Sequence, residues 1–427
     1  MTPREVPQVL IVGAGIGGLC LAHGLRAADI PCRVVERTHT PTDWVQGYRI
    51  HIDPHGSTAL HRCLSPAAWQ AFLGAVSDEA SGFAFRTEQL APLLEIADAG
   101  GGPEPSRRHH GISRVALRET LLTGLDGIVE FGRGFERYEL GTDGRVTAHF
   151  SDDTSATADL IVGADGANSR VRTQLLPHAG RADTGVVAIA GKHRLDREHP
   201  TLAPALTRGA VSVLPSRRGF LFSAVWLGDR TRVAPPVDAP TGFLFDTTTD
   251  YVFWAYADAA AAFPPLKTLS ELSGSRLQEI VGDKIAGWSP HLRALVSGSE
   301  PETVNALRVR SADPVRPWTT GPVTLLGDAI HNMTPMAGIG ANTALRDADL
   351  LRRVLINTPA DPAALRRAIS GYEHEMLGYG FAAVADSLRN ARLAGSESRL
   401  QRATIRTLFR VIDHIPAAKR RMFAPPT

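Results

Sequence analysis

A glycine-rich turn near the N-terminus has the residue types and spacing needed to bind a dinucleotide. Gly13, Gly15 and Gly18 form a G-x-G-x-x-G motif between an apolar run over 9–12 and a helical pattern. The first glycine permits a tight turn, the second lets the backbone approach a pyrophosphate, and the third lets the helix pack against the sheet. Glu36 ends the next predicted strand, where a carboxylate can accept hydrogen bonds from ribose hydroxyls. The spacing therefore predicts a βαβ unit that binds a dinucleotide.

Two later segments place an acidic residue close after a predicted buried strand. Asp165-Gly166 follows an apolar run over 160–162, and Gly327-Asp328 follows one over 323–326. The second segment leads into residues that favour turns and a helix start, namely Pro335, Gly338, Gly340, Ala341 and Asn342. A helix is predicted from about 342 to 355. An NAD-dependent dehydrogenase would leave both segments unexplained, because it needs only the glycine motif.

In order and spacing, these three motifs resemble those of the group A flavoprotein monooxygenases, the aromatic hydroxylases typified by para-hydroxybenzoate hydroxylase. The resemblance covers almost the whole chain. It implies bound FAD, NADPH or NADH as a transient reductant, and insertion of one oxygen atom from O2 into a small aromatic substrate through a C4a-hydroperoxyflavin. At the level of the family, the substrate is expected to be phenolic or polyketide-like, with a role in secondary metabolism or aromatic catabolism.

The resemblance also assigns cofactor-binding roles to residues of this chain. The residues that match the family's FAD motifs are Gly13, Gly15, Gly18, Glu36, Arg37, Arg114, Asp165, Gly166, Asp328, Gly338, Gly340, Ala341 and Asn342. Ser169 and Arg172 belong to the Asp-Gly segment, which is associated with both FAD and the nicotinamide cofactor. Arg118 is the nearby alternative to Arg114. Ile330 and Ile339 depart from the Ala and Gln that are common in the family.

Catalytic and substrate-binding residues are less well defined by the sequence. Arg49 and His51 lie two apart, so a strand would place both on one side, either beside flavin and substrate or facing solvent. No catalytic base is identified. Aromatic residues of extended segments, Phe222, Trp226 and Trp254, together with Pro335, are candidates for an apolar substrate pocket. Core packing is the alternative for such aromatics, including Phe243 and Phe245.

The pattern of elements predicts an α/β fold with a discontinuous Rossmann-like FAD-binding domain, an inserted β-rich substrate domain and C-terminal helices. The FAD-binding domain is expected over 1–80, 100–184 and 296–390, and the substrate domain over 81–99 and 185–295. Residues 112–125 are predicted to be helical. Residues 391–427 form a basic helical segment in which Arg399, Arg402, Arg406 and Arg410 share one face. We expect a solvated helix packed across the FAD-binding domain, with docking to a carrier protein, a membrane surface or another subunit as the alternative.

Composition excludes several other classes of protein. The chain has 427 residues, 43% of them hydrophobic and 21% charged, with a formal net charge of +2. These values are typical of a globular protein and give no broad surface for nucleic acid. The three cysteines lack C-x-x-C spacing, and His51, His55 and His61 fit no usual ligand set, so no metal is expected. We expect a cytoplasmic monomer or homodimer with no stable membrane association, because neither a signal-peptide pattern nor a long apolar run is present.

Several alternatives to aromatic hydroxylation stay open at this point. Baeyer–Villiger oxidation, epoxidation, decarboxylative hydroxylation and substrate oxidation use flavin on the same fold. A flavin-binding protein without turnover is the alternative from a different class. A halogenase is disfavoured, because the chain has no Trp-x-Trp-x-Ile-Pro segment. The sequence specifies neither the substrate and its regiochemistry nor the choice between NADH and NADPH.

Overall fold

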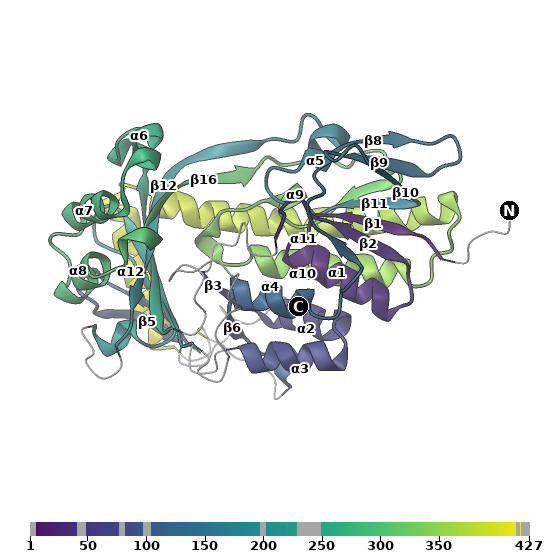
Figure 1. Cartoon of the computed structure of the whole chain (residues 1–427). Coiled ribbons are helices and arrows are strands. Elements are labelled where there is room, and N and C mark those ends of the chain that lie inside the picture. The colour runs from purple at the N-terminus through teal and green to yellow at the C-terminus, as the bar shows by residue number, and fades with distance from the viewer. Residues whose placement is uncertain are drawn as a thin grey trace.

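The computed structural model describes residues 6–40, 48–76, 82–96, 104–196, 202–228, 249–415 and 419. They form two units that lie side by side, each built around one large sheet (Figure 1). Among these residues, no helix combines the length and the apolar character needed to cross a membrane. The arrangement confirms the predicted α/β fold with a second, β-rich unit.

The first unit contains a five-stranded parallel sheet. From one edge to the other its strands are β17 (Val323–Leu325), β11 (Leu160–Gly163), β1 (Val9–Val12), β2 (Cys32–Val35) and β7 (Val129–Glu130). Residues of β1, β11 and β17 are almost completely buried. Such continuous apolar runs are expected where helices cover both faces of a parallel sheet.

Helices and two small sheets complete this unit. The helices are α1 (Ile16–Ala27), α2 (Pro54–Cys63), α3 (Pro66–Ala75), α4 (Arg114–Leu122), α5 (Arg170–Leu175), α9 (Asp328–His331), α10 (Gly340–Leu355) and α11 (Pro362–Ala394). One antiparallel sheet is formed by β8 (Phe135–Leu140), β9 (Val146–Phe150) and β10 (Ser155–Ala158), and the other by β3 (Arg49–Ile52) and β6 (His110–Ser113). The predicted helix over 112–125 is wrong at its start, because residues 112 and 113 pair with β3 before α4 begins.

The second unit contains a mixed seven-stranded sheet. Its strands, in spatial order, are β16 (Asn305–Ala312), β12 (Arg181–Arg194), β15 (Tyr251–Ala259), β14 (Phe220–Trp226), β13 (Ala210–Val213), β4 (Phe83–Arg86) and β5 (Pro92–Ile96). Only β13 and β4 pair in parallel among these neighbours. One face packs against α6 (Leu266–Glu271), α7 (Gly274–Lys284) and α8 (Pro290–Ser297). The other, which we call the inner face, turns toward the first unit (Figure 1).

Short 3-10 helices connect several of these elements. They are η2 (Pro105–Arg107), η3 (Pro204–Leu206), η4 (Ala260–Ala262), η5 (Pro301–Thr303) and η6 (Pro335–Ala337). Long elements cross the domain limits expected from the sequence. β12 spans the limit between 184 and 185, with an irregularity in register between Asp183 and Val186, and β16 extends the second sheet to residue 312. α11 runs past residue 390 and contacts both α10 and β12.

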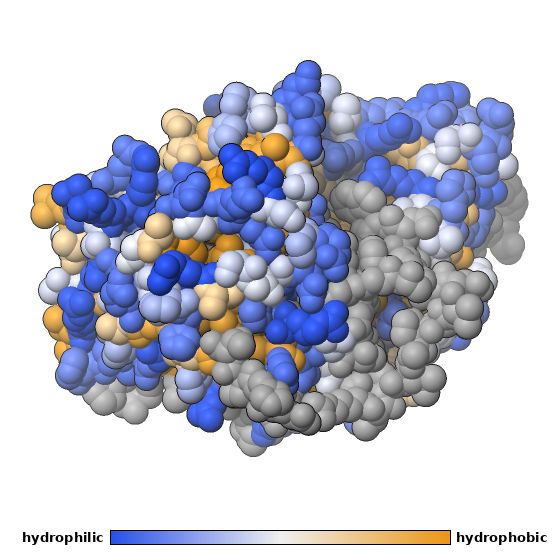
Figure 2. All heavy atoms as spheres, turned by 60° about the vertical axis from the view of Figure 1, so that its left-hand side comes forward, coloured by the Kyte–Doolittle hydropathy of each residue, from blue (hydrophilic) through white to orange (hydrophobic). Residues whose placement is uncertain are grey.

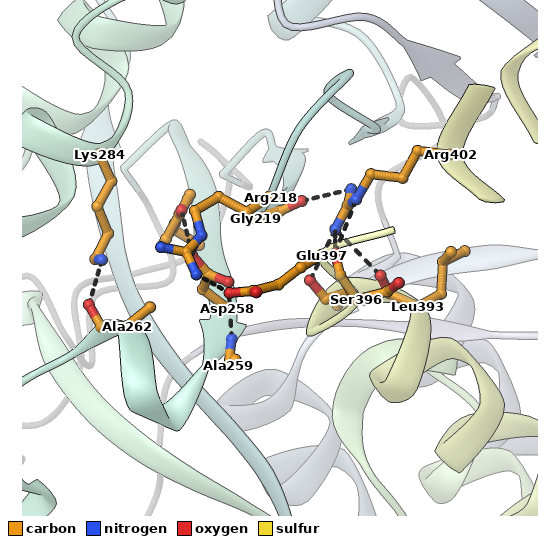
Figure 3. Close-up of polar contacts among 12 residues, drawn as sticks. Arg218, Gly219, Asp258, Ala259, Ala262, Lys284, Leu393, Ser396, Glu397 and Arg402 are labelled. Atoms are coloured by element: carbon orange, nitrogen blue, oxygen red, sulfur yellow. Dashed lines mark hydrogen bonds and ion pairs between the residues drawn. The ribbon is translucent and has the colours of Figure 1, made fainter. Parts of the chain in front are cut away.

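The last helix, α12 (Arg399–Asp413), packs against β5 of the second unit and not across the first unit as expected. Arg402 is fully buried, and its guanidinium donates to the carbonyl oxygens of Gly219 at 2.9 Å and Ser396 at 3.0 Å (Figure 3). Arg399 stays exposed. The four arginines therefore do not form one solvated face. Arg402 points inward from the helix and donates to a carbonyl oxygen in the loop before β14.

The outward side of α12 carries exposed apolar residues. Leu400, Leu408 and Val411 retain 79%, 51% and 52% of their surface. Seen from the side of the second unit, apolar patches lie among mostly hydrophilic residues (Figure 2).

Candidate active site

The glycine turn leaves no room for a side chain at two of its three glycines. Gly13 has φ +111°, and a Cβ at this position would lie 2.5 Å from the carbonyl oxygen of Ala164. A Cβ at Gly18 would lie 2.2 Å from the carbonyl oxygen of Gly13, and Gly15 caps the N-terminus of α1 in an extended conformation. Free N–H groups at this helix end, without side chains in the way, suit a pyrophosphate. The residues therefore fit the diphosphate of FAD.

Glu36 lies beside the glycine turn, immediately after β2. Its Oε2 accepts a hydrogen bond from the N–H of Ala14 at 2.8 Å, and its Oε1 accepts one from Thr38 at 3.0 Å. A carboxylate has further lone pairs for the hydroxyls of a ribose. Arg37 follows it with an exposed side chain. This arrangement suits the adenosine half of the cofactor.

Two arginines of α4 were alternatives for a cofactor contact. Arg114 is the first residue of the helix and is exposed. Arg118, one turn later, donates from Nε to the carbonyl oxygen of Ala14 at 3.3 Å. The structure thus brings Arg118 to the glycine turn and leaves the guanidinium of Arg114 at the surface.

The Asp-Gly segment caps α5 at the carboxyl end of β11. Asp165 Oδ2 accepts hydrogen bonds from the N–H groups of Arg170 at 2.7 Å and Val171 at 3.3 Å. Its Oδ1 is buried and accepts no hydrogen bond from the described residues. Burial raises the pKa of Asp165 above its ordinary value, although the N–H donors act against this rise. Gly166 follows with φ +75°, in the left-handed region that favours glycine.

Arg172 joins the Asp-Gly segment to the Gly-Asp segment. Its guanidinium donates to the carbonyl oxygens of Ala329 at 2.8 Å and Ala167 at 3.1 Å, and Ser169 Oγ accepts from its backbone N–H. Arg172 and Ser169 are both buried. Their contacts hold the two acidic segments side by side at one edge of the parallel sheet.

The Gly-Asp segment sets a carboxylate next to the start of α10. Asp328 is exposed at the first position of α9, and a Cβ at Gly340 would lie 4.0 Å from its Oδ1. Gly338 adopts φ +66°, and Gly340 and Ala341 begin the 16-residue helix α10. The N–H groups of this helix end stabilise negative charge, and the acceptor-only carboxylate suits the ribityl hydroxyls. The residues fit the flavin half of FAD.

Asn342 positions the neighbouring sheet through its side chain. Its Oδ1 accepts from the N–H of Asp53 at 2.9 Å, and its Nδ2 donates to the carbonyl oxygen of His51 at 2.9 Å. A Cβ at Gly56 would lie 2.3 Å from that Oδ1, so only glycine leaves room for it. This amide fastens β3 to the N-terminus of α10, and its contact with the cofactor stays a prediction.

β3 and the residue before it meet the inner face of the second sheet, and we call this contact region the junction. The first unit contributes Tyr48, Arg49 and His51, and the second contributes Lys192, Tyr251 and Phe253. Tyr48 packs on Phe253 with ring centroids 4.6 Å apart. Ile52 points the other way, into the core of the first unit. Arg49 and His51 share the side opposite Ile52, because strand side chains alternate.

His51 forms a hydrogen-bonded pair with His109. The Nε2 of His51 lies 2.8 Å from the Nδ1 of His109, and the rings stack with centroids 4.9 Å apart. Burial, and after it the charge of Arg49, lowers the pKa of His51 to about 3. His51 is therefore neutral at ordinary pH. His109 is half-buried.

The expected aromatic pocket residues divide between the two faces of the sheet. Trp226 packs with Tyr251 on the inner face, and Phe222 lies 6.3 Å from Phe253 between ring centroids. Trp254 was expected beside them. Because side chains alternate along β15, Trp254 instead lies on the opposite face of the sheet, where its Nε1 donates to Ser299 Oγ at 2.7 Å. Its assignment to the pocket is wrong for that reason.

The remaining residues predicted for the substrate site do not lie on either face of the seven-stranded sheet or are not described. Pro335 begins η6 and is exposed, and the adjacent Met336 packs against the inner face. Phe243 and Phe245 lie outside the described residues.

Sequence reasoning did not single out Lys192. It lies on β12 within the buried stretch 186–193 and has no exposed surface. The available signal was a lysine that continues the inward alternation of Val186, Ala188 and Ala190.

Comparison with known proteins agrees with this geometry. Residues 291–386 match the FAD binding domain family, and residues 11–74 match the NAD(P)-binding Rossmann-like domain family. A crystal structure of a putative FAD-containing monooxygenase from Photorhabdus luminescens is 36% identical, covers 91% of this chain and 98% of that chain, and has a TM-score of 0.76. The structure of Klebsiella pneumoniae HpxO with FAD and uric acid shares the fold, with a TM-score of 0.77 at 22% identity over 96% of this chain and 95% of that one.

Curated relatives extend the comparison to named enzymes. The 3-amino-4-hydroxybenzoate 2-monooxygenase PtmB3 of Streptomyces platensis is 30% identical over 84% of this chain and 83% of its own length. The dual O-methyltransferase/FAD-dependent monooxygenase elcB of Phaeosphaeria nodorum is 32% identical over 84% of this chain, which spans only 41% of elcB. The chain also spans less than half of two similar Cercospora proteins. This chain belongs to the group A FAD-dependent aromatic monooxygenases.

Proposed function

We propose that this protein is an FAD-dependent monooxygenase that consumes NADPH or NADH and inserts one atom of O2 into a small aromatic molecule. The observation that carries the proposal is the junction, where Asn342 fastens β3 to the α10 N-terminus and aromatic side chains of a second sheet face β3. Relatives named as a urate hydroxylase and an aminohydroxybenzoate monooxygenase act on aromatic molecules, which supports the same substrate class here.

The chain's own residues hold and orient the cofactor. The turn containing Gly13, Gly15 and Gly18 would bind the pyrophosphate, Glu36 the adenosine ribose, and Asp328 the ribityl chain. Bound FAD supplies the redox chemistry, namely acceptance of hydride from the nicotinamide and activation of O2. The α10 N-terminus would favour negative charge on the flavin through its dipole.

The junction would orient the substrate and exclude water. Apolar ring surface is provided by Tyr48, Tyr251 and Phe253. Such surface favours an aromatic ligand and keeps water away from the reacting atoms. The His51–His109 pair would carry a proton away from the junction. A neutral imidazole can accept a proton at one ring nitrogen while its other nitrogen donates to the neighbouring ring.

The cellular setting is also a proposal. Cys20, Cys32 and Cys63 are free thiols, which suits a reducing compartment, so we propose the cytoplasm.

Aerobic consumption of NADH and NADPH by the FAD-loaded protein tests the proposal. Phenols and hydroxylated polyketide aromatics are added in turn, and product mass and peroxide are measured together. We expect at least one compound to stimulate consumption and to gain one oxygen atom. Consumption that yields no oxygenated product with any compound would contradict the proposal.

A matched pair of glycine variants tests whether the activity depends on the proposed FAD cradle. Gly18→Ala should lose FAD, because its Cβ would meet the Gly13 carbonyl at 2.2 Å. Gly282→Ala, in open space on α7, should retain FAD. Flavin absorbance after gel filtration measures retention, and equal retention by both variants would place the cofactor elsewhere.

A further inference from the structure

Asp347 is a fully buried carboxylate in the middle of α10. It has no exposed surface, and neither has the imidazole of His331, the last residue of α9. A carboxylate is stable at such a depth only where hydrogen bonds or an opposite charge compensate for the loss of water. The groups that compensate Asp347 therefore show what this carboxylate holds in place.

Three donors from three parts of the first unit converge on this carboxylate. The backbone N–H of Gly327 donates to its Oδ2 at 2.7 Å, and Nε2 of His331 lies 2.7 Å from the same oxygen. The hydroxyl of Tyr379, on α11, donates to its Oδ1 at 2.5 Å. Gly327 immediately precedes α9, and His331 ends it. One side chain of α10 thus fixes both ends of the short helix whose first residue is Asp328.

The turn from β17 into α9 depends on this contact. Gly327 adopts φ +61°, in the left-handed region that favours glycine. A Cβ at Gly327 would lie 3.0 Å from the Cβ of Ala344, so the turn packs closely on the first part of α10. Its N–H reaches Asp347 one turn further along the same helix. Without that carboxylate, the N–H of Gly327 would lose its acceptor.

The imidazole of His331 also depends on Asp347 for its orientation. Its other nitrogen, Nδ1, is buried and has no hydrogen-bond partner among the described residues. Burial alone would lower the pKa of His331, but the charge and the hydrogen bond of Asp347 raise it above its ordinary value. The ring lies against α11, where a Cβ at Gly380 would lie 2.7 Å from its Cδ2. One hydrogen bond and close packing on a glycine therefore hold the ring.

We propose that Asp347 is a positioning residue of the flavin site. Its carboxylate fixes α9 on α10 and thereby sets Asp328 where it would meet the ribityl chain, beside the start of α10. This inference rests on the proposed cofactor site, in which Asp328 and the N–H groups of α10 face the flavin. Asp347 acts through Gly327 and His331, and not by contact with the cofactor.

The rate of FAD release and the reduction potential of the bound flavin test this role together. Asp347→Asn keeps the shape of the side chain but offers its donors one acceptor oxygen in place of two. We expect the FAD-loaded variant to release FAD at least about tenfold faster than the wild type, as measured by flavin fluorescence after dilution. The potential should fall by about 30 mV, a tenfold loss of preference for reduced flavin, because the displaced start of α10 stabilises its negative charge less.

Asp349 offers a matched control on the same helix. It is 5% exposed and accepts hydrogen bonds from Arg352 at 2.9 Å and from Arg62 of α2 at 3.2 Å. Asp349→Asn also removes a buried carboxylate, so it should lower the unfolding free energy. It should leave the rate of FAD release and the flavin potential as in the wild type. Equal changes of both quantities in the two variants would overturn the proposal, because a general loss of stability would then explain them.

A second pair of variants leaves Asp347 intact and decides the matter if Asp347→Asn does not fold. Gly380→Ala places a methyl group against the imidazole of His331, which displaces the ring. Gly378→Ala, also on α11, meets no atom within 4 Å. Gly380→Ala should accelerate FAD release and lower the potential, and Gly378→Ala should change neither. Wild-type values of both quantities in Gly380→Ala would overturn the proposal.

These measurements need no turnover, so this inference and the proposed function can fail separately. Faster release of FAD from Asp347→Asn and Gly380→Ala, in a protein that oxygenates no aromatic molecule, would overturn the monooxygenase function and leave the role of Asp347. Oxygenation of an aromatic molecule, with wild-type FAD release and potential in both variants, would overturn the role of Asp347 alone.

Discussion

Arg402 and Lys192 are both fully buried cations of the β-rich unit, yet their surroundings differ. Arg402 donates to backbone carbonyl oxygens of the loop before β14 and of the turn between α11 and α12 (Figure 3). Lys192 lies against the faces of Tyr251 and Tyr48 at the junction. Carbonyl oxygens in a fixed loop accept hydrogen bonds from a guanidinium, whereas ring faces attract a cation through their quadrupole. The first charge joins a loop to a helix end within the β-rich unit, and the second lies where the two units meet.

The largest effect is expected from removing the guanidinium of Arg402. Arg402→Met leaves the carbonyl oxygens of Gly219 and Ser396 buried without their donor, which should cost about 3–5 kcal/mol of unfolding free energy. Denaturant unfolding measures the loss. Arg399→Met, at the exposed start of the same helix, should cost under about 0.5 kcal/mol. If Arg402→Met lowered the unfolding free energy by less than about 1 kcal/mol, the hydrogen bonds of Arg402 would not stabilise the fold, and the contrast with Lys192 would fail.

A buried carboxylate in the first unit extends the comparison to negative charge. Glu373 lies against a cavity of about 90 Å³ between α11 and the segment 317–320, and accepts hydrogen bonds from the hydroxyls of Thr320 at 2.6 Å and Thr324 at 2.9 Å. Burial raises the pKa of Glu373 to about 7, although the hydroxyls oppose this effect. Glu373 is therefore satisfied by hydroxyl donors of the protein, just as Arg402 is satisfied by carbonyl acceptors.

This raised pKa predicts how stability changes with pH. Below the ordinary pKa of 4.5, folded and unfolded chains both carry the proton at Glu373. Between about pH 4.5 and 7 only the folded chain retains it, so the unfolding free energy falls as pH rises, by about 3 kcal/mol in total, and levels off above 7. Glu373→Gln should remove this slope in denaturant unfolding measured from pH 4 to 8. Parallel curves for variant and wild type would contradict the assignment.

A smaller effect on stability is expected at Lys192. Lys192→Met keeps the length of the side chain against Tyr251 and removes the attraction between the ammonium and the ring, so the unfolding free energy should fall by about 2 kcal/mol. The same unfolding assay measures it. A loss as large as that of Arg402→Met would show that this charge also serves folding.

The smallest effect is expected at Arg218, which forms an ion pair with Glu397 and lies 3.8 Å from Asp258 Oδ2 (Figure 3). The side chains of Arg218 and Glu397 are 49% and 65% exposed, so water and salt screen the ion pair between them. Arg218→Met should cost under about 1 kcal/mol, and the cost should shrink as salt is added. A cost that does not depend on salt would indicate packing in place of charge.

The cofactor site could be predicted from the sequence because its chemistry depends on local backbone geometry. Gly13 and Gly18 are required where a Cβ would meet a carbonyl oxygen, and Glu36 follows a strand whose end the sequence marks. The direction of Trp254 was missed, because an apolar run that is buried on both faces gives no sign of which residues turn inward. The contacts of Asn342 with residues 51 and 53 join segments almost 300 positions apart.

The junction lay beyond sequence reasoning for the same reason. Tyr48, Lys192 and Tyr251 belong to three separate strands or their flanks, and only the docking of β3 on the inner face brings them together. A single lysine in an apolar strand is a weak signal on its own. Its significance follows from the alternation of β12 and from the rings that the fold places around it.

Incorporation of labelled oxygen tests the central claim most directly. The FAD-loaded protein is incubated under ¹⁸O2 with NADPH and each aromatic molecule that binds, and the products are analysed by mass. We expect one ¹⁸O atom in the product of at least one of these aromatic molecules. Peroxide without labelled product from every bound aromatic would contradict the account.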